Sequence, residues 1–327
     1  MLSILGVGHA YGATPIDNKF LSELNGAFDP AWILKRSGIS SRASVLSHGY
    51  LAESGNSNPL LAVQNSVETP TDLSIKAAQM AIERAGVTPE QIGLIIGDTA
   101  TPLETTPSEA QRVGQRLGLK IPAYDFSGLC SVLPLHLEAL SSWQAERTPQ
   151  YILSLSSNSP TQFVNYRSGL EGAFFGDAAG AMVLSATQSG KLSVLDAFYQ
   201  TEVENSQALT LETYGSTRVE FNSLEEFIRR RSQEVLAKLI PELQLGSCAV
   251  VGPEFEPNLF REIAKGYKLS EAQIWSSAER SGYALGATPY CTLSEKWSSM
   301  RSNQELLIIT AGGGLSFGYA KLKVSGS

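Results

Sequence analysis

The apolar positions of the chain follow two different periods. In residues 72–86, apolar side chains recur every three or four positions, which predicts an amphipathic helix. Asp72 can cap the start of this helix and Gly86 can end it. The apolar run that follows, residues 92–98, is short and lacks helical spacing, so it predicts a buried strand. These two segments begin a regular alternation of helices and strands.

The same order of elements occurs twice along the chain. Each series has a helix, a strand, a helix, a strand, a turn leading into a helix, and a last strand. The simplest explanation is an internal duplication of one α/β unit, with halves at residues 1–185 and 186–327. Alternating strands and helices imply mostly parallel sheets with helices on their faces. The predicted segments are 72–86, 92–98, 107–119, 121–126, 130–143 and 151–157, then 223–239, 247–253, 257–269, 272–278, 282–297 and 305–314.

Composition and charge limit the kind of partner. The 327 residues suffice for about two structural units, and 43% of them are hydrophobic, enough for a core. A net charge of −7 argues against a nucleic acid or a membrane surface, because both require a basic face. No signal peptide or membrane span is predicted. The three cysteines lack the number and spacing of a disulfide framework or zinc site, so we expect no metal and a reducing cytoplasm.

Four turns follow predicted strands at the same end. They are the turn at Cys130 and the segments 252–258, 281–287 and 311–318. In sheets of this type, functional sites form at the carboxyl ends of the strands. We therefore expect these four turns to meet.

Cys130 stands where a strand passes through a turn into a helix. A helix N-terminus favours a thiolate, and its free N–H groups can hold the oxyanion formed when a thioester is attacked. The alternative is a small buried cysteine, the commoner fate of this residue type. Cys248 and Cys291 lie within a predicted strand and helix, so for them the buried alternative is favoured.

The histidines and glycines give two further expectations. His136 follows Cys130 by six positions on the same predicted helix, so it faces another side and is a poor base for that thiol. His9 and His48 lie in irregular segments. The run of glycines at 312–314 allows either a backbone N–H, that of Gly313, to face a substrate carbonyl, or a tight turn against the core.

Four motifs, in this order, resemble those of β-ketoacyl-ACP synthase III, a thiolase-fold family. The family pattern W-I-x-x-R-S/T-G-I-x-x-R is matched by WILKRSGISSR at residues 32–42, and the cysteine loop by DFSGLCSVL at residues 125–133. The family's F-G-D-G-A-G-A is similar to FGDAAGA at residues 175–181, and its G-G-G-x-x-x-G to GGGLSFG at residues 312–318. The motifs span nearly the whole chain.

This resemblance implies a thiolase fold with α-β-α-β-α layers and two duplicated halves. It also implies that Cys130 carries an acyl group as a thioester, with an oxyanion hole made of the backbone N–H groups of Cys130 and Gly313. Trp32 and Arg36 would contact CoA or carrier protein at the mouth of a pantetheine tunnel. The implied substrates are acyl-CoA or the phosphopantetheine thioester of acyl carrier protein, with no permanently bound cofactor. The implied assembly is a homodimer.

The chain departs from the family at two motifs. Where the family has histidine in P-H-Q-A-N, Glu254 follows Pro253 here, and Gly282 or Tyr283 stands where the asparagine of G-N-T/V belongs. In the family, that pair donates hydrogen bonds to the thioester carbonyl as malonyl loses CO₂. A carboxylate would repel the resulting enolate, which argues against decarboxylative condensation. Glu254 is either a general base with a pKa raised by a dry tunnel or a solvated loop acid.

Three functions stay open. The first, which we favour, is an acyltransferase that loads an acyl group from acyl-CoA or acyl-ACP onto Cys130 and passes it to an acceptor in fatty-acid-derived or polyketide-type specialised metabolism. The second is a condensing enzyme whose missing groups come from Glu254, Tyr283 or a partner chain. The third is a non-catalytic subunit in a heterodimer with another ketosynthase-like chain. The presence of Cys130 and of the glycine run favours catalysis over the third.

Overall fold

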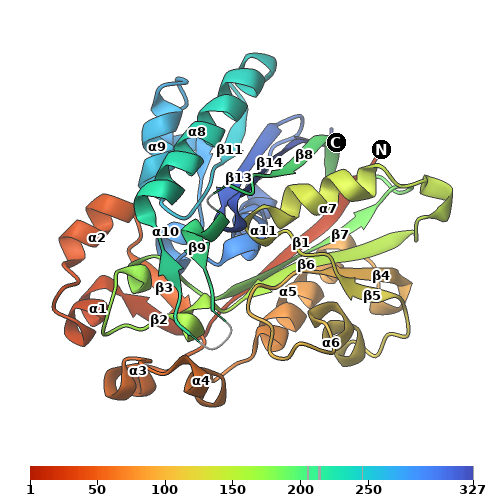
Figure 1. Cartoon of the computed structure of the whole chain (residues 1–327). Coiled ribbons are helices and arrows are strands. Elements are labelled where there is room, and N and C mark those ends of the chain that lie inside the picture. Colours follow the sequence, from red (N-terminus) through yellow and green to blue (C-terminus); the bar gives the residue numbers. More distant parts are fainter. Residues whose placement is uncertain (205, 213–214, 245, 327) are drawn as a thin grey trace.

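One mixed sheet of ten strands runs through the molecule. The computed structural model describes residues 1–204, 206–212, 215–244 and 246–326. The strands lie in the order β12-β11-β13-β14-β8-β1-β7-β6-β4-β5 (Figure 1). Their bounds are β1 (Ser3–Tyr11), β4 (Ile92–Gly97), β5 (Ala123–Asp125), β6 (Tyr151–Asn158), β7 (Ala178–Ser185), β8 (Leu192–Thr201), β11 (Ala249–Val251), β12 (Ile274–Trp275), β13 (Glu305–Gly312) and β14 (Ser316–Val324).

The strand order repeats on the two sides of the sheet centre. Outward from β1 come β7, β6, β4 and β5, and outward from β8 come β14, β13, β11 and β12. The strands of the second series are connected in the same order as those of the first, which is what an internal duplication produces. The two series join through a short antiparallel pairing of β1 with β8, at Ser3 with Ser193 and Ile4 with Leu192. The boundary between residues 185 and 186 falls in the β7–β8 connection, and as a domain division it stays a prediction.

The expectation of mostly parallel sheets is wrong. Strand β4 is parallel to β5 and β6, and β11 is parallel to β12 and β13. The inner strands β1, β7, β8 and β14 pair antiparallel with their neighbours. A tight turn connects β13 to β14, and such a turn can join only antiparallel strands.

Helices form three layers around the sheet, as the fold class predicts (Figure 1). Helix α7 (Val132–Ser141) packs on β8 and β14, and α11 (Thr288–Lys296) packs on β1 and β7, so each of these two helices lies on strands of the other half. Helices α5 (Pro70–Ala85) and α6 (Glu109–Arg116) cover the first series on the outside. Helices α8 (Phe221–Leu239) and α9 (Pro257–Lys265) cover the second. With the two halves of the ten-stranded sheet counted as separate β layers, the resulting order of layers is α-β-α-β-α.

Shorter elements surround this frame. They are β2 (Thr14–Asp17), β3 (Ser41–Ser44), β9 (Leu209–Thr210), β10 (Arg218–Val219), α1 (Asn18–Leu24), α2 (Pro30–Ser37), α3 (His48–Ser54), α4 (Pro59–Ala62) and α10 (Ala278–Ser281). The helix predicted over residues 72–86 begins earlier than expected. Helix α5 begins at Pro70 with Thr69 as its cap, and Asp72 completes a capping box instead of capping the helix itself.

The packing of α5 against β1 depends on glycine. A Cβ atom at Gly8 would overlap the carbonyl oxygen of Ala77, and one at Gly6 would overlap that of Ala81. The strand and the helix backbone can approach this closely only because neither glycine has a side chain. In this fold, the two glycines serve helix packing.

We expect Gly8→Ala to lower the free energy of unfolding by about 1–3 kcal/mol, because the added methyl group forces α5 away from β1. Urea unfolding followed by circular dichroism measures this change. Gly49→Ala is the matched control, since a Cβ atom there meets nothing within 4 Å. Equal stability of the Gly8→Ala variant and the unmodified protein would contradict the close packing.

Candidate active site

The loop before Cys130 is fixed by one buried carboxylate. Asp98, directly after β4, accepts hydrogen bonds from the N–H of Gly128 at 3.1 Å, the N–H of Leu129 at 3.3 Å and the hydroxyl of Ser127 at 2.7 Å. Leu129 has a positive φ of 49°, a conformation that costs energy for a branched side chain. The bonds to Asp98 hold that strained conformation and so set where Cys130 stands.

Asp98 is a residue that the sequence reasoning missed. Its second oxygen accepts a hydrogen bond from Ser156 Oγ at 2.8 Å, and its side chain is fully buried. Burial raises the pKa of the Asp98 carboxyl, while its four hydrogen bonds act in the opposite direction. An aspartate at the end of an apolar strand was the available signal, but its partners lie about thirty or more positions away in the sequence.

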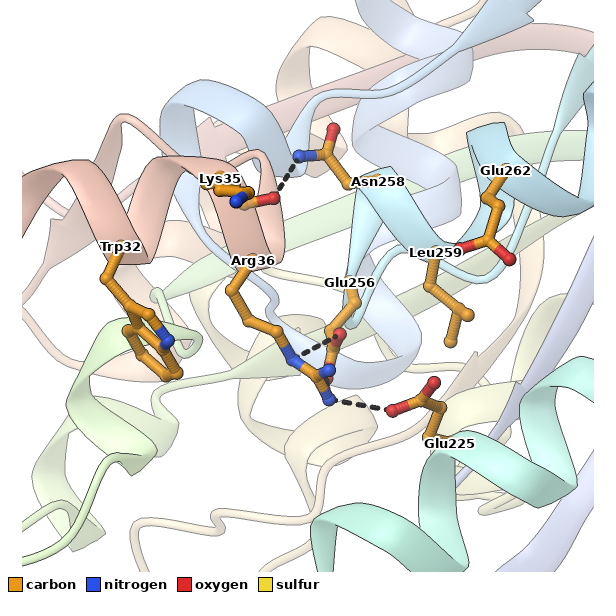
Figure 2. A pocket seen from close by; sticks show the side chains of 8 residues that line it. All are labelled: Trp32, Lys35, Arg36, Glu225, Glu256, Asn258, Leu259 and Glu262. Carbon is orange, nitrogen blue, oxygen red and sulfur yellow. Dashed lines mark hydrogen bonds and ion pairs between the residues drawn. The ribbon is translucent and has the colours of Figure 1, made fainter.

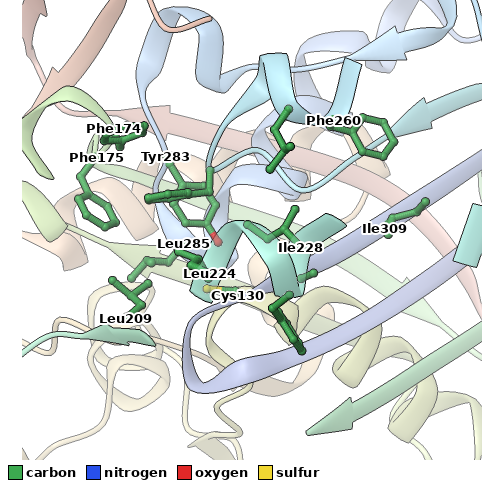
Figure 3. Close-up of a cluster of buried hydrophobic side chains, with 14 of the residues drawn as sticks. Cys130, Phe174, Phe175, Leu209, Leu224, Ile228, Phe260, Tyr283, Leu285 and Ile309 are labelled. Atoms are coloured by element: carbon green, nitrogen blue, oxygen red, sulfur yellow. The ribbon is translucent and has the colours of Figure 1, made fainter. Parts of the chain in front are cut away.

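The sulfur of Cys130 is buried and receives two hydrogen bonds. The Tyr283 hydroxyl and the backbone N–H of Gly313 both bond the thiol, and Figure 3 shows the Tyr283 hydroxyl directed toward it. Cys130 is 3% exposed. Burial raises the pKa of the thiol to about 11 in spite of these bonds. The prediction that the helix N-terminus lowers the pKa of the Cys130 thiol is therefore wrong, because the effect of desolvation is larger.

The glycine run makes the close approach to Cys130 possible. A Cβ atom at Gly312 would lie 2.8 Å from both Cβ and Sγ of Cys130, and 3.1 Å from the Tyr283 hydroxyl. No side chain fits at that position. Of the two alternatives for the run, the structure supports a backbone that faces the candidate nucleophile.

Glu254 is buried and fully hydrogen-bonded. Its Oε2 accepts from the Ser276 hydroxyl at 2.7 Å and from the N–H groups of Ser277 and Ala278 at 2.8 and 3.2 Å. Its Oε1 accepts from the Thr292 hydroxyl at 2.7 Å. The side chain is 4% exposed, so the solvated-loop-acid alternative is wrong. Burial raises the pKa of the carboxyl to about 7, against the lowering effect of these bonds.

Two pockets meet at Cys130. The first, here the closed pocket, is lined by Cys130, Glu254 and Tyr283 among others, and its volume of about 10 Å³ holds about one water molecule. The second, here the open pocket, has a volume of about 300 Å³ and is lined by Cys130, Gly313 and residues of the segment 206–211. Parts of the four predicted turns thus surround one thiol, as expected.

The chain is similar to known proteins in sequence and in fold. The protein-family model for 3-Oxoacyl-[acyl-carrier-protein (ACP)] synthase III matches residues 124–202. The chain is 29% identical over 241 residues to a Beta-ketoacyl-[acyl-carrier-protein] synthase III of Rhizorhabdus wittichii, covering 73% of this chain and 68% of the relative. It is 24% identical over 323 residues to the synthase III of a Sulfurovum strain, covering 92% and 94%. The crystal structure of the Aquifex aeolicus synthase III superimposes with a TM-score of 0.82 over 99% of this chain and all of that one, at 22% identity, which supports the fold.

In sequence and in fold, the chain is thus similar to ketosynthase III proteins. In the described residues of this ketosynthase III-like chain, no histidine lies beside the Cys130 thiol. His136 donates or accepts through Nδ1 with Ser154 Oγ at 2.9 Å and through Nε2 with the Phe126 carbonyl at 2.7 Å. Burial lowers the pKa of His136 to about 4, so it is a neutral structural residue and, as predicted, no base for Cys130.

Trp32 and Arg36 line a separate pocket of about 330 Å³, here the Arg36 pocket (Figure 2). Arg36 Nη2 lies 2.7 Å from Glu225 Oε2, and Arg36 Nε lies 3.2 Å from Glu256 Oε2. Burial raises the pKa of the Glu256 carboxyl to about 7, although Arg36 lowers it. The contact of Arg36 with CoA or carrier protein stays a prediction. The two glutamates that already bind Arg36 argue against it.

The described residues contain neither a cluster of metal ligands nor a helix suited to a membrane. Within residues 1–204, 206–212, 215–244 and 246–326, no group of three or more His, Cys, Asp or Glu side chains is placed to hold a metal ion. None of the helices in that part of the ketosynthase III-like chain is long and apolar enough to cross a membrane. In the described residues, no disulfide joins Cys130, Cys248 and Cys291.

We expect Glu254→Gln to change how stability depends on pH. The folded protein raises the pKa of this carboxyl from an ordinary value of 4.5 to about 7, so its stabilising proton is fully bound below 4.5 and lost as pH rises through 7. Between pH 5 and 8, the unmodified protein should therefore lose up to about 3 kcal/mol relative to the variant. Urea unfolding of both proteins across this range measures the difference, and parallel pH profiles would contradict the buried carboxyl.

Tyr283→Phe should slow alkylation of Cys130 by iodoacetamide about three- to tenfold at fixed pH. The lost hydrogen bond is worth about 0.5–1.5 kcal/mol, and its removal raises the pKa of the thiol further. Intact-protein mass spectrometry gives the rate. Tyr290→Phe is the control, because that buried hydroxyl bonds Ser154 at 3.1 Å and not the thiol. Equal rates for the unmodified protein and Tyr283→Phe would exclude the bond.

Proposed function

We propose that this ketosynthase III-like chain is an acyltransferase. It takes an acyl group from a CoA or carrier-protein thioester onto Cys130 and passes it to an acceptor without decarboxylation. The observation that supports this most is the position of the Cys130 sulfur, which bonds Tyr283 and Gly313 and opens to a largely apolar pocket. A donor thioester carbonyl in that pocket would meet both the sulfur and the backbone N–H of Gly313.

In the first step, the sulfur attacks the carbonyl carbon of the donor thioester. The bond from that carbon to the donor sulfur breaks, and the proton of the Cys130 thiol passes to the departing thiolate. The N–H groups of Cys130 and Gly313 stabilise the tetrahedral oxyanion between these events. Stabilisation of the oxyanion by these two N–H groups offsets part of the cost of ionising a thiol with a pKa of about 11.

Glu254 is the proton carrier in this proposal. It lines the closed pocket with Cys130, and that pocket has room for about one water molecule. We place the proton relay between the thiol and Glu254 on one water in this pocket, a kind of relay that general acid–base catalysis accepts. Its pKa of about 7 lies near the expected working pH, where a group both takes up and releases protons readily.

In the second step, an alcohol, amine or activated methylene attacks the acyl carbon on Cys130. The bond from carbon to Cys130 sulfur breaks, the acceptor loses its proton to Glu254, and the thiol is restored by that proton. Ionised Glu254 would repel the enolate that decarboxylation creates, while it assists removal of a proton from an acceptor. This is why we place the reaction outside decarboxylative condensation.

The setting we propose is fatty-acid-derived or polyketide-type specialised metabolism in the cytoplasm, with a homodimer as the working form.

A second candidate is a non-catalytic subunit that pairs with another ketosynthase-like chain. The observation in its favour is the Arg36 pocket, where Glu225 and Glu256 bind Arg36. A condensing enzyme that uses Glu254 or a partner's groups is the third.

We expect an acyl adduct on Cys130 when the purified protein meets a panel of acyl-CoA and acyl-carrier thioesters. Intact-protein mass spectrometry detects it, and Cys130→Ala is the control because Cys248 and Cys291 are also present in that variant. An adduct on unmodified protein alone supports the acyltransferase. Absence of an adduct with every donor, from folded protein whose Cys130 still reacts with iodoacetamide, would favour the subunit candidate.

A further inference from the structure

A row of hydrogen-bonded hydroxyl groups starts at Glu254. The Thr292 hydroxyl, on α11, lies 2.7 Å from Glu254 Oε1 and 2.8 Å from the hydroxyl of Ser277, the residue before α10. The Ser277 side chain in turn hydrogen-bonds the hydroxyl of Tyr11, the last residue of β1. The hydroxyl groups of Thr292, Ser277 and Tyr11, here the hydroxyl chain, thus follow one another from the buried carboxyl.

The other end of the hydroxyl chain lies at a pocket not yet described. The Tyr11 hydroxyl donates a hydrogen bond to Glu295 Oε1 at 2.9 Å, and Glu295 Oε2 lies 2.7 Å from Arg280 Nη2. The side chain of Glu295 is 21% exposed and that of Arg280 is 66% exposed, whereas Thr292 and Ser277 are at most 1% exposed. Tyr11, Arg280 and Glu295 line a pocket of about 410 Å³, here the Arg280 pocket. Among the described residues, it shares no lining residue with the two pockets at Cys130.

The donors of the hydroxyl chain can all point toward Glu295. A protonated Glu254 then donates to Thr292, and Thr292 donates to Ser277. Ser277 donates to Tyr11, and Tyr11 donates to Glu295. A hydroxyl group both accepts and donates, so each one can take up a proton on one side and release its own on the other. One proton then moves from Glu254 to Glu295, and every hydroxyl group ends with one proton, as it began.

Glu254 needs a proton exit if it acts as a base. It must be ionised before it accepts a proton, and burial raises the pKa of its carboxyl to about 7. The closed pocket beside it holds about one water molecule. The other ionisable side chains that interact with Glu254 are those of Tyr283 and Cys291, and burial raises the pKa of both. Both groups therefore stay protonated and cannot take up the proton of Glu254.

We propose that Glu254 exchanges its proton with solvent at the Arg280 pocket, through the hydroxyl chain of Thr292, Ser277 and Tyr11. This inference rests on the proposed function for the use made of the proton, because Glu254 serves there as the base. The exchange itself needs no substrate and can be measured without one. The three hydroxyl residues touch no reacting atom, so they are positioning residues for the proton.

Tyr11→Phe tests the route because it removes the hydroxyl at the far end of the chain and keeps the ring. The readout is the infrared C=O stretch of protonated Glu254, identified by its absence from Glu254→Gln, after a rapid pH change from about 6 to about 8, on either side of its pKa. In Tyr11→Phe, loss of this band should be at least about tenfold slower, which corresponds to about 1.4 kcal/mol of added barrier. The midpoint of the equilibrium titration should not change, because Glu254 keeps all of its own hydrogen bonds.

A second variant and a control complete the experiment. Ser277→Ala should slow the loss of the band as Tyr11→Phe does, and it replaces that variant if thermal unfolding shows that Tyr11→Phe is not folded. Tyr290→Phe is the matched control and should not change the rate, because this buried hydroxyl bonds Ser154 at 3.1 Å and lies outside the hydroxyl chain.

The outcomes separate this inference from the proposed function. If the folded variants lose the proton as fast as the unmodified protein, or if Tyr290→Phe is slowed equally, the hydroxyl chain is only structural and the route is overturned, whether or not Cys130 is acylated. If Tyr11→Phe and Ser277→Ala are slow while Tyr290→Phe is not, the route is supported. If that result holds but Cys130 takes an acyl group from no donor, the proposed function fails and the proton route of Glu254 stands.

Discussion

The carboxylate of Asp98 holds the geometry on which the rest of the site depends. It lies at the end of β4 and accepts hydrogen bonds from Ser127, Gly128 and Leu129 in the loop that follows β5. These bonds compensate for the burial of its charge and for the positive φ of Leu129. Without them, the turn before α7 could relax, and the Cys130 sulfur would no longer meet the backbone of Gly313. A single buried acid thus connects the sheet to the nucleophile.

Desolvation is the second constraint, and it acts on every ionisable group near the thiol. Burial raises the pKa of Cys130 to about 11 and that of Glu254 to about 7. The resting site therefore carries a neutral thiol beside a carboxyl that is close to half-protonated at neutral pH. Such a site does not store a thiolate. In the reaction that we propose, the thiolate forms as the donor binds, when the proton leaves and the N–H groups of Cys130 and Gly313 stabilise the developing charge.

Local patterns in the sequence predicted helices on the faces of a sheet, and the resemblance to β-ketoacyl-ACP synthase III implied the order of the layers. The turns at 252–258, 281–287 and 311–318 follow the neighbouring strands β11, β12 and β13, so their closeness follows from the strand order. The Cys130 turn follows β5 at the opposite edge of the sheet, so its meeting with them depends on tertiary packing. The antiparallel strands β7, β8 and β14 were missed, because their segments carry no distinctive spacing and their pairing is set by tertiary contacts. Asp98 was missed for the same reason, since its partners come from β6 and a distant loop.

The role in donor binding that the family resemblance implies for Trp32 and Arg36 shows the limit of an argument from a matching motif. The local pattern around them matches the family, yet Glu225 and Glu256 reach Arg36 from α8 and from the residue before α9, about two hundred positions away. Likewise Phe255 occupies space beside Tyr283 that no short motif describes. Substitutions outside a motif can therefore change what the motif's residues are able to bind.

The most direct test of the account is the pH dependence of acyl transfer from Cys130 with and without the Glu254 carboxyl. Single-turnover release of a preloaded acyl group to an amine, followed by mass spectrometry from pH 5 to 9, provides it. If Glu254 is the base, the rate in the unmodified protein should rise through pH 7, because the base must be ionised. In Glu254→Gln, the rate should not rise through pH 7. Identical profiles for the two proteins would show that Glu254 carries no proton in the reaction.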